Sequence, residues 1–278
     1  MVQLAELDTE RDTLDATLSY FADTKATPVT VVAPPGESDK RLGGGASEPH
    51  RVTLRNGRPH IAEFDIEKHG FRFVPHNTRV ADFYDEDEIS RVYYPEMEAL
   101  VKAETGAKRV VVFDHTLRTA DDELRQAAKI REVVRRVHND YTDWSGPQRV
   151  RDLMGDEAEE LLKHRFAIVQ VWRPIRHPVE SWPLAIADAR SLSPDDIVVT
   201  ERRYPDRVGQ TSAITWNAEH RWYWFPHMRP DEALVFKTFE SMTDGRARFT
   251  AHTAFEDPTT PPHARPRESI EIRTLAFF

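Results

Sequence analysis

Short apolar segments follow one another at regular intervals through the second half of the chain, and they constrain its fold more than any other feature. They are rich in β-branched and aromatic residues, and stretches containing Pro, Asp or Gly separate them. Such spacing is typical of the strands of an all-β sandwich or barrel. The predicted strands are residues 166–172, 197–201, 211–216, 221–225, 233–239, 248–252 and 269–275.

The first half mixes strand and helix patterns. Asn56 and Gly57 separate two apolar segments and predict a type I′ hairpin turn. Residues 85–105 have acids in the first turn and Gly106 after the end, which predicts a helix that Pro95 kinks or splits. Further predictions are strands at residues 52–55, 61–66 and 109–113, a helix or mobile charged segment at 121–136, and a helix at 145–164.

No linker divides the two halves, so we expect one domain over residues 1–278, mainly β with flanking helices (α+β). Residues 1–50 are expected to form a polar lead-in of helical character followed by a flexible loop. Residues 51–278 are expected to form a β-barrel core with helical decoration.

The composition excludes several classes of site. The chain has no cysteine, which rules out disulfides, thiolate nucleophiles, zinc fingers and iron–sulfur clusters. A metal would therefore bind to His, Asp, Glu or backbone oxygen. The net charge of −9 argues against a general nucleic-acid binder. The sequence contains neither a membrane-length apolar run nor a signal-peptide core, so we expect a cytoplasmic protein that does not associate with membranes.

One histidine pattern suits a 2-His-1-carboxylate iron site, in which three ligands leave the other positions open. Of the twelve histidines, only His138 has an acid two positions later, Asp140. Side chains two apart on a strand point the same way. The acidic content alone would give roughly two such pairs by chance, so a surface strand end is an open alternative for this pair.

The last predicted strand carries a second pattern. Ile270 and Ile272 face one way, whereas Arg267, Ser269 and two further charged residues face the other. Arg267 and Ser269 form the only Arg-x-Ser of the chain. A guanidinium and a hydroxyl side by side suit the distal carboxylate of 2-oxoglutarate. His252 ends the preceding strand pattern, so we expect adjacent antiparallel strands to bring it near Arg267.

The order of these motifs along the chain, a His-x-Asp pair, a distant histidine and then an Arg-x-Ser, resembles that of iron(II)/2-oxoglutarate-dependent dioxygenases. More specifically, the chain resembles the hydroxylase/desaturase family of secondary-metabolite clusters, which is related to cephamycin 7α-methoxylation components and gibberellin desaturase. The resembling stretches are residues 111–118, 136–142, 171–175, 183–185, 222–226, 231–237, 252–259 and 266–273. The resemblance implies a double-stranded β-helix core of the jelly-roll or cupin type, with iron(II), 2-oxoglutarate and O2 as cofactor and co-substrates.

The resemblance also implies residue roles. Iron(II) would bind to His138, Asp140 and His252, and the 2-oxoglutarate carboxylate to Arg267 and Ser269. The spacing of 15 residues between His252 and Arg267 is longer than is usual in the family. Extra turn residues at 258–266 would absorb the difference. The alternative is that Arg265 or Arg273 shares the carboxylate with Arg267.

Five residues are candidate substrate contacts, and three of them have a structural alternative. His115 is either a pocket residue near Arg118 or a hydrogen-bonded strand end. Arg173 pairs with a substrate carboxylate or forms a structural salt bridge. Tyr141 follows the ligand pair and is expected in the pocket. Trp222 belongs to an aromatic strand that forms either a substrate wall or, as we favour, barrel core.

The resulting expectation is an oxygenase that hydroxylates, desaturates or cyclises a small natural product and releases succinate and CO2. Its partner is a small-molecule substrate, and we expect a monomer or homodimer. Two alternatives are a catalytically degenerate β-barrel that binds a small ligand and a cupin-type metal enzyme that does not use 2-oxoglutarate.

Overall fold

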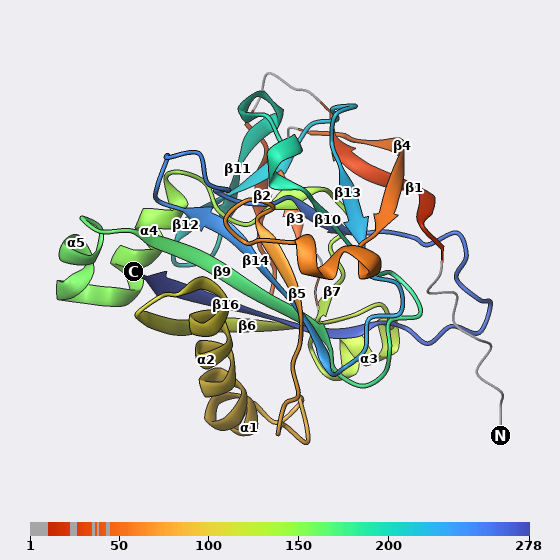
Figure 1. Cartoon of the computed structure of the whole chain (residues 1–278), viewed down its shortest axis with the longest axis horizontal. Coiled ribbons are helices and arrows are strands. Elements are labelled where there is room, and N and C mark those ends of the chain that lie inside the picture. The colour runs from red at the N-terminus through yellow and green to blue at the C-terminus, as the bar shows by residue number, and fades with distance from the viewer. Residues whose placement is uncertain (1–10, 23–26, 35–36, 38, 43–44) are drawn as a thin grey trace.

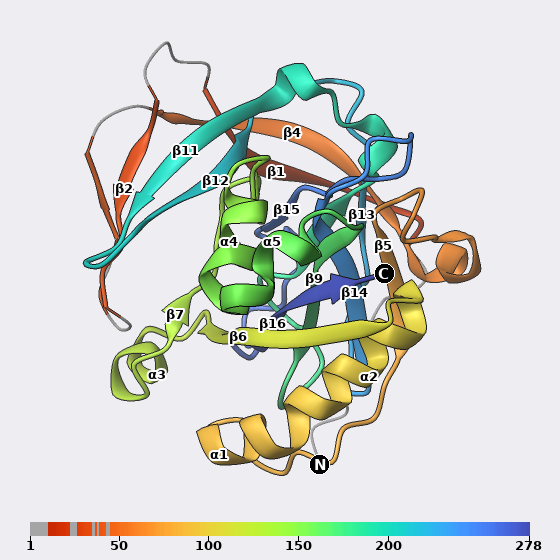
Figure 2. The ribbon, with the colours of Figure 1, turned by 90° about the vertical axis from the view of Figure 1, so that its left-hand side faces the viewer.

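The computed structural model describes residues 11–278 apart from positions 23–26, 35–36, 38 and 43–44. Within these residues, strands form two curved sheets that face each other (Figure 2). The larger sheet has ten strands in the order β1-β4-β13-β10-β15-β8-β12-β11-β2-β3, and the smaller has six in the order β5-β14-β9-β16-β6-β7. The prediction of a mainly β fold with flanking helices is confirmed.

The strands of the larger sheet are β1 (Thr13–Phe21), β2 (Val29–Val31), β3 (Lys40–Arg41), β4 (Ser47–Asn56), β8 (His138–Asn139), β10 (Leu184–Ala187), β11 (Ile197–Arg203), β12 (Val208–Ile214), β13 (Trp222–Trp224) and β15 (His252–Ala254). Those of the smaller sheet are β5 (Phe71–Pro75), β6 (Arg109–Thr119), β7 (Arg131–Glu132), β9 (Phe166–Pro174), β14 (Glu232–Glu240) and β16 (Glu268–Phe277). The helices are α1 (Glu86–Glu88), α2 (Tyr94–Thr105), α3 (Asp122–Ala127), α4 (Ser145–Met154) and α5 (Ala158–Leu161) (Figure 1).

The outer face of the smaller sheet is apolar and covered by α2 (Figure 2). Ile270 and Ile272 of β16 pack there in one buried cluster with Met97 and Val101 of α2. Because strand side chains alternate between faces, the odd-numbered residues of β16 point the other way, toward the larger sheet. The predicted alternation of this strand is confirmed, and it sends polar and charged side chains into the space between the sheets.

Apolar side chains from both sheets meet next to these polar ones. Trp172 and Phe236 of the smaller sheet share a buried cluster with Ile186 of the larger sheet and with Phe225, which follows β13. This cluster fixes the spacing of the two sheets, since interior packing tolerates few voids. The space between the sheets is therefore part solid core and part open pocket.

The helical lead-in and flexible loop expected over residues 1–50 are wrong for the part of this segment that the structure describes, which contains strands. Residues 13–21 form β1, in which Leu14, Leu18 and Tyr20 alternate with exposed residues, a period of two and not of a helix. The expected flexible loop at residues 31–50 includes β3 and the start of β4. These strands complete the larger sheet, so the described strands between residues 13 and 50 are part of the fold. The Gly43 and Gly44 positions lie outside the described residues.

The expected hairpin at Asn56 and Gly57 is also absent. A type I′ turn needs positive φ at both central residues, whereas Gly57 has φ −78° and leads into a 3₁₀ helix at Arg58–Glu63. Strand β4 pairs instead with β1 and β13, both distant in the sequence. A proline in the first turn of the 3₁₀ helix, Pro59, fits this helical start.

The helix expected at residues 85–105 is present and split, as predicted, into α1, a π-helical turn and α2, with Pro95 in the first turn of α2 and Gly106 at its end with φ 74°. The helix expected at residues 145–164 breaks at Gly155. The segment 121–136, expected as a helix or a mobile charged segment, contains α3 and β7. Strand β10 was not predicted. No helix in the described part of the chain has the length and apolar character of a membrane span.

A buried ion cluster ties the smaller sheet to the loops beside it. The Lys237 side chain on β14 is fully buried, and its Nζ donates to Glu67 Oε2 at 2.7 Å and to Glu240 Oε2 at 2.9 Å. Arg165 Nη2 reaches the same two carboxylates at 2.7 and 2.8 Å. A buried lysine requires such partners, because an unpaired charge is costly to bury.

We expect Lys237→Met to lower the free energy of unfolding by about 3 kcal/mol, because it removes one of the two cations that pair with the buried Glu240 carboxylate. Urea denaturation followed by circular dichroism measures this loss. The matched control is Lys163→Met, which removes a pair with Glu160 in which both side chains are 67% exposed. The control is expected to cost less than about 1 kcal/mol. Equal losses in the two variants would contradict a role for the buried cluster.

Candidate metal and co-substrate site

Three potential metal ligands meet on neighbouring strands of the larger sheet. His138 on β8 lies directly opposite His252 on β15 in an antiparallel pair, and Asp140 follows β8. One ligand atom from each of the three residues lies within 4.8 Å of the other two. The two rings are 4.3 Å apart between centroids. The fold thus brings His252 to the pair of His138 and Asp140 that their sequence spacing predicts.

Asp140 is held by donors on one oxygen and left open on the other. Its Oδ2 accepts hydrogen bonds from Arg273 Nε at 3.2 Å and from Gln170 Nε2, whereas its Oδ1 lies 3.3 Å from His138 Nε2. Burial opposes ionisation of this carboxyl, but Arg273 and His138 outweigh burial and hold the pKa of Asp140 well below its usual value. The carboxylate is therefore ionised, and Oδ1 faces the histidines.

Both histidines contribute a ring nitrogen to the ligand cluster, and an imidazole nitrogen is a common metal ligand. The His138 Nδ1 lies 2.8 Å from the Arg136 carbonyl oxygen, which orients the ring and directs Nε2 toward Asp140. His252 is buried against the Phe236 ring, and burial together with His138 lowers the pKa of His252 to about 3. Within the described residues, its buried Nδ1 has no hydrogen-bond partner.

Arg267 and Ser269 are buried with unused hydrogen-bonding capacity. Arg267 is 2% exposed, and its Nη1 donates to the Trp182 carbonyl at 2.6 Å. Its Nε and the Ser269 Oγ lack a partner among the described residues. Burial and the charge of Arg118 lower the pKa of Arg267 to about 9. A buried cation with an unpaired Nε and a neighbouring buried hydroxyl without a partner among the described residues fit a carboxylate ligand.

The strand arrangement differs from the expectation in one respect. Strand β15, with His252, belongs to the larger sheet, whereas Arg267 immediately precedes β16 in the smaller sheet. The two residues therefore approach from facing sheets and not from adjacent strands. The intervening residues 255–266 cross from one sheet to the other, which explains why the spacing is long.

The two cations considered beside Arg267 have other partners. Arg265 is half-exposed and pairs with Glu180. Arg273 contacts Asp140 and also donates to Asp114 Oδ1 at 3.0 Å. Burial opposes its charge, but the acids around it, Asp114 first, raise the pKa of Arg273 well above its usual value. Neither guanidinium is free to take part of the role expected for Arg267.

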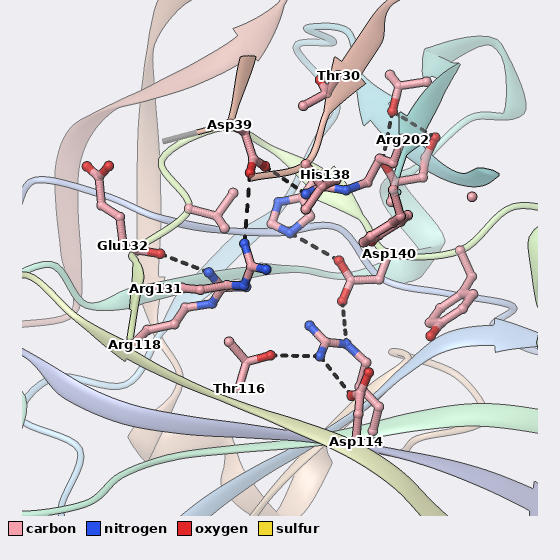
Figure 3. A pocket seen from close by; sticks show the side chains of 18 of the residues that line it. Thr30, Asp39, Asp114, Thr116, Arg118, Arg131, Glu132, His138, Asp140 and Arg202 are labelled. Carbon is pink, nitrogen blue, oxygen red and sulfur yellow. Dashed lines mark hydrogen bonds and ion pairs between the residues drawn. The ribbon is translucent and has the colours of Figure 1, made fainter. Parts of the chain in front are cut away.

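A pocket of about 900 Å³ opens beside His138 and Asp140 (Figure 3), whereas His252, Arg267 and Ser269 do not line it. Its lining includes His138 and Asp140, together with three of the expected substrate contacts. Those three are His115, Arg118 and Tyr141. The pocket lies between the two sheets, with residues of β6 and β7 on one side and residues of β11 and β12 on the other.

Two candidate substrate contacts do not line the pocket: Arg173, and Trp222, for which barrel core was the favoured interpretation. Trp222 is fully buried in core, and its Nε1 donates to the Tyr20 hydroxyl at 2.7 Å. Arg173 is 1% exposed and donates to His76 Nδ1 at 3.0 Å and to the Pro230 carbonyl oxygen. Both side chains form their hydrogen bonds inside the protein, and neither lines the pocket.

One residue of the site was missed from the sequence. Gln170 lies in β9, where every residue is buried, and its amide donates to Asp140. A lone amide in the apolar segment 166–172 is a usable signal, because a buried polar side chain requires a partner. The partner itself lies 30 positions away, and no local pattern identifies it.

Known proteins share both sequence and structure with this chain. A family model described as "Oxidoreductase/YMDC permease-like domain" matches residues 18–277. The Fe(II)/2-oxoglutarate-dependent dioxygenase nvfI of Aspergillus novofumigatus is 34% identical over 236 residues, which cover 82% of this chain and 84% of that protein. The alpha-ketoglutarate-dependent dioxygenase phiK of a fungal species is 31% identical over 280 residues, which cover 98% and 99%.

A third relative is the hydroxylase/desaturase CTB9 of Cercospora beticola, 34% identical over 253 residues that cover 83% of this chain and 77% of that protein. Among solved structures, the iron and alpha-ketoglutarate-dependent endoperoxidase NvfI matches with a TM-score of 0.84 at 29% identity and covers 96% of this chain and 98% of that one. The facing sheets are thus the jelly-roll core of an oxygenase. The chain belongs to the family of Fe(II)/2-oxoglutarate-dependent dioxygenases and hydroxylase/desaturases.

Proposed function

We propose that His138, Asp140 and His252 hold the iron(II) of this dioxygenase, and that Arg267 and Ser269 bind the distal carboxylate of 2-oxoglutarate. One observation carries the proposal: three ligand atoms lie within 4.8 Å of one another, and a buried guanidinium with unused donors approaches from the facing sheet. The donor set of two imidazoles and one carboxylate suits iron(II).

Iron(II), 2-oxoglutarate and O2 together supply the oxidising power for a C–H bond and leave succinate and CO2. The residues of the chain prepare the site for this chemistry. Gln170 and Arg273 fix Asp140 so that one oxygen faces the histidines, and the Arg136 carbonyl orients the His138 ring. Arg267 and Ser269 provide donors in a dry site, where a charge-assisted hydrogen bond is strong.

For the substrate we propose a small natural product that enters the pocket beside His138 and Asp140, with His115, Arg118 and Tyr141 along its wall. The relatives carry names that include hydroxylase/desaturase and endoperoxidase. These names support hydroxylation, desaturation or ring formation as the reaction. The proposal includes one domain over the chain, a cytoplasmic location, and a monomer or homodimer that binds neither nucleic acid nor membrane.

The test of the function is a spectroscopic titration under anaerobic conditions. We expect the full chain with iron(II) and 2-oxoglutarate to give the weak visible absorption band of the iron–2-oxoglutarate chelate. A protein that binds iron without forming the band would be a metal enzyme that does not use 2-oxoglutarate. A protein that binds no iron would be a degenerate small-ligand barrel. Either result contradicts the proposal.

We expect His252→Ala and Asp140→Ala each to abolish succinate formation, because each removes one of three metal ligands. Iron content after desalting and coupled succinate detection measure the two effects. The matched control is His263→Ala, which changes an exposed histidine outside the site and is expected to keep both iron and activity. Full succinate formation by either ligand variant would refute the ligand assignment.

We expect Arg267→Gln to raise the KM for 2-oxoglutarate at least about 30-fold, because loss of a buried charged partner costs roughly 2–5 kcal/mol. The Kd for iron is expected to change much less. Steady-state kinetics and equilibrium dialysis separate the two. Arg265→Gln, which removes an exposed arginine paired with Glu180, is the matched control. A parallel loss of iron and 2-oxoglutarate binding in Arg267→Gln would point to misfolding and contradict the assigned role.

A further inference from the structure

The pocket carries charge of the opposite sign to the chain as a whole. The chain has 47 Asp and Glu against 38 Lys and Arg. The pocket lining has seven Asp and Glu against ten Lys and Arg, and Arg267 is not one of the ten. A concave site with an excess of one sign concentrates ligands of the other. The pocket therefore favours an anionic small molecule, independently of the proposed 2-oxoglutarate anchor.

Three of these cations approach one another from both sheets (Figure 3). Arg118 on β6 lies opposite Arg131 on β7, and Arg202 on β11 approaches from the larger sheet. Glu271 neutralises Arg118 by a bidentate pair at 3.0 and 2.7 Å. Arg131 and Arg202 share the Asp39 carboxylate, which is the ion-pair partner that the described residues provide for both. Burial opposes the charge of Arg202, but Tyr204, Asp39 and the more distant Asp140 raise its pKa.

The Asp39 carboxylate does not satisfy both guanidinium groups. Its Oδ2 accepts from Arg202 Nη2 at 2.8 Å, but its Oδ1 lies 3.8 Å from Arg131 Nη1, beyond hydrogen-bond distance. Burial and the charge of Arg118 lower the pKa of Arg131, although Asp39 opposes them. All three side chains are 30% exposed, so a ligand in the pocket can reach them.

We propose that the substrate carries a carboxylate, and that Arg131 and Arg202 bind this carboxylate in competition with Asp39. The inference rests on the proposed function, because it concerns the substrate of the same pocket. Asp39 demonstrates that a carboxylate fits between the two guanidinium groups, each of which offers parallel N–H donors to such a ligand. His138 lines the same pocket, so a molecule anchored at this pair lies in one cavity with the metal-ligand candidates.

The test compares two probes that differ in charge and hardly in size, pyrenebutyrate and its methyl ester. Pyrene fluorescence reports binding to the full chain, loaded anaerobically with iron(II) and saturating 2-oxoglutarate so that the proposed co-substrate site is filled. We expect the acid to bind at least about tenfold more tightly than the ester, since a hydrogen bond to a charged group contributes that much.

Substitutions locate the site of the carboxylate. We expect Arg202→Gln and Arg131→Gln each to weaken acid binding about tenfold and to leave ester binding unchanged. Asp39→Asn is expected to tighten acid binding about threefold or more, because it removes the competing anion. A folding defect does not tighten binding. The matched control is Arg51→Gln, which breaks an exposed pair with Asp15 outside the pocket and is expected to change neither affinity.

Equal affinities for acid and ester would overturn the inference, as would equal effects of Arg202→Gln and Arg51→Gln. Recording the iron–2-oxoglutarate band in the same sample separates this outcome from failure of the proposed function. A normal band with no preference for the acid overturns the carboxylate site alone. An absent band overturns the proposed function, while the ratio of acid to ester affinity still decides whether Arg131 and Arg202 bind a carboxylate.

Discussion

Strand β16 holds opposite chemistry on its two faces, and the architecture of the site depends on this separation. Its isoleucines pack under α2 on the outside of the smaller sheet, while Ser269, Glu271 and Arg273 point between the sheets. The free-energy cost of burying charge there is reduced because each charged side chain has an oppositely charged partner or is available to bind a ligand. Glu271 illustrates the balance, since burial opposes its ionisation but Arg118 and Arg273 lower its pKa to about 2. The apolar face secures the strand, and the polar face provides the chemistry.

The charged groups form one connected network from the pocket to the metal-ligand candidates. Arg118 binds Glu271, Glu271 contacts Arg273, and Arg273 donates to Asp140. Asp140 is thereby positioned by one cation, Arg273, and one amide, Gln170, from the facing sheet, as well as by its contact with His138. Arg267 lies outside this network, which leaves its donors for a ligand. The same interior therefore contains satisfied cations that orient a carboxylate and an unsatisfied one that is suited to bind another.

Local periodicity was enough to predict β9, β11, β12, β13, β14 and β16, the alternation of β16 and the pairing of His138 with Asp140. It placed the strand that carries His252 at residues 248–252, whereas β15 spans His252–Ala254. It failed where structure depends on distant partners. Strand β1 alternates buried and exposed residues, but it was expected to belong to a helical lead-in. Strand β10 was not predicted, and it is only four residues long. Trp222 was ambiguous because core and pocket aromatics have the same sequence signature. The meeting of Arg202 with Asp39 joins residues 163 positions apart, which no motif encodes.

The most direct test of the account is a crystal structure of the protein grown anaerobically with iron(II) and 2-oxoglutarate, with anomalous data at the iron edge. We predict one anomalous peak bounded by His138, Asp140 and His252, and a co-substrate whose distal carboxylate contacts Arg267 and Ser269. A peak at other side chains, or a 2-oxoglutarate molecule anchored by Arg273 or Arg202 in place of Arg267, would contradict it.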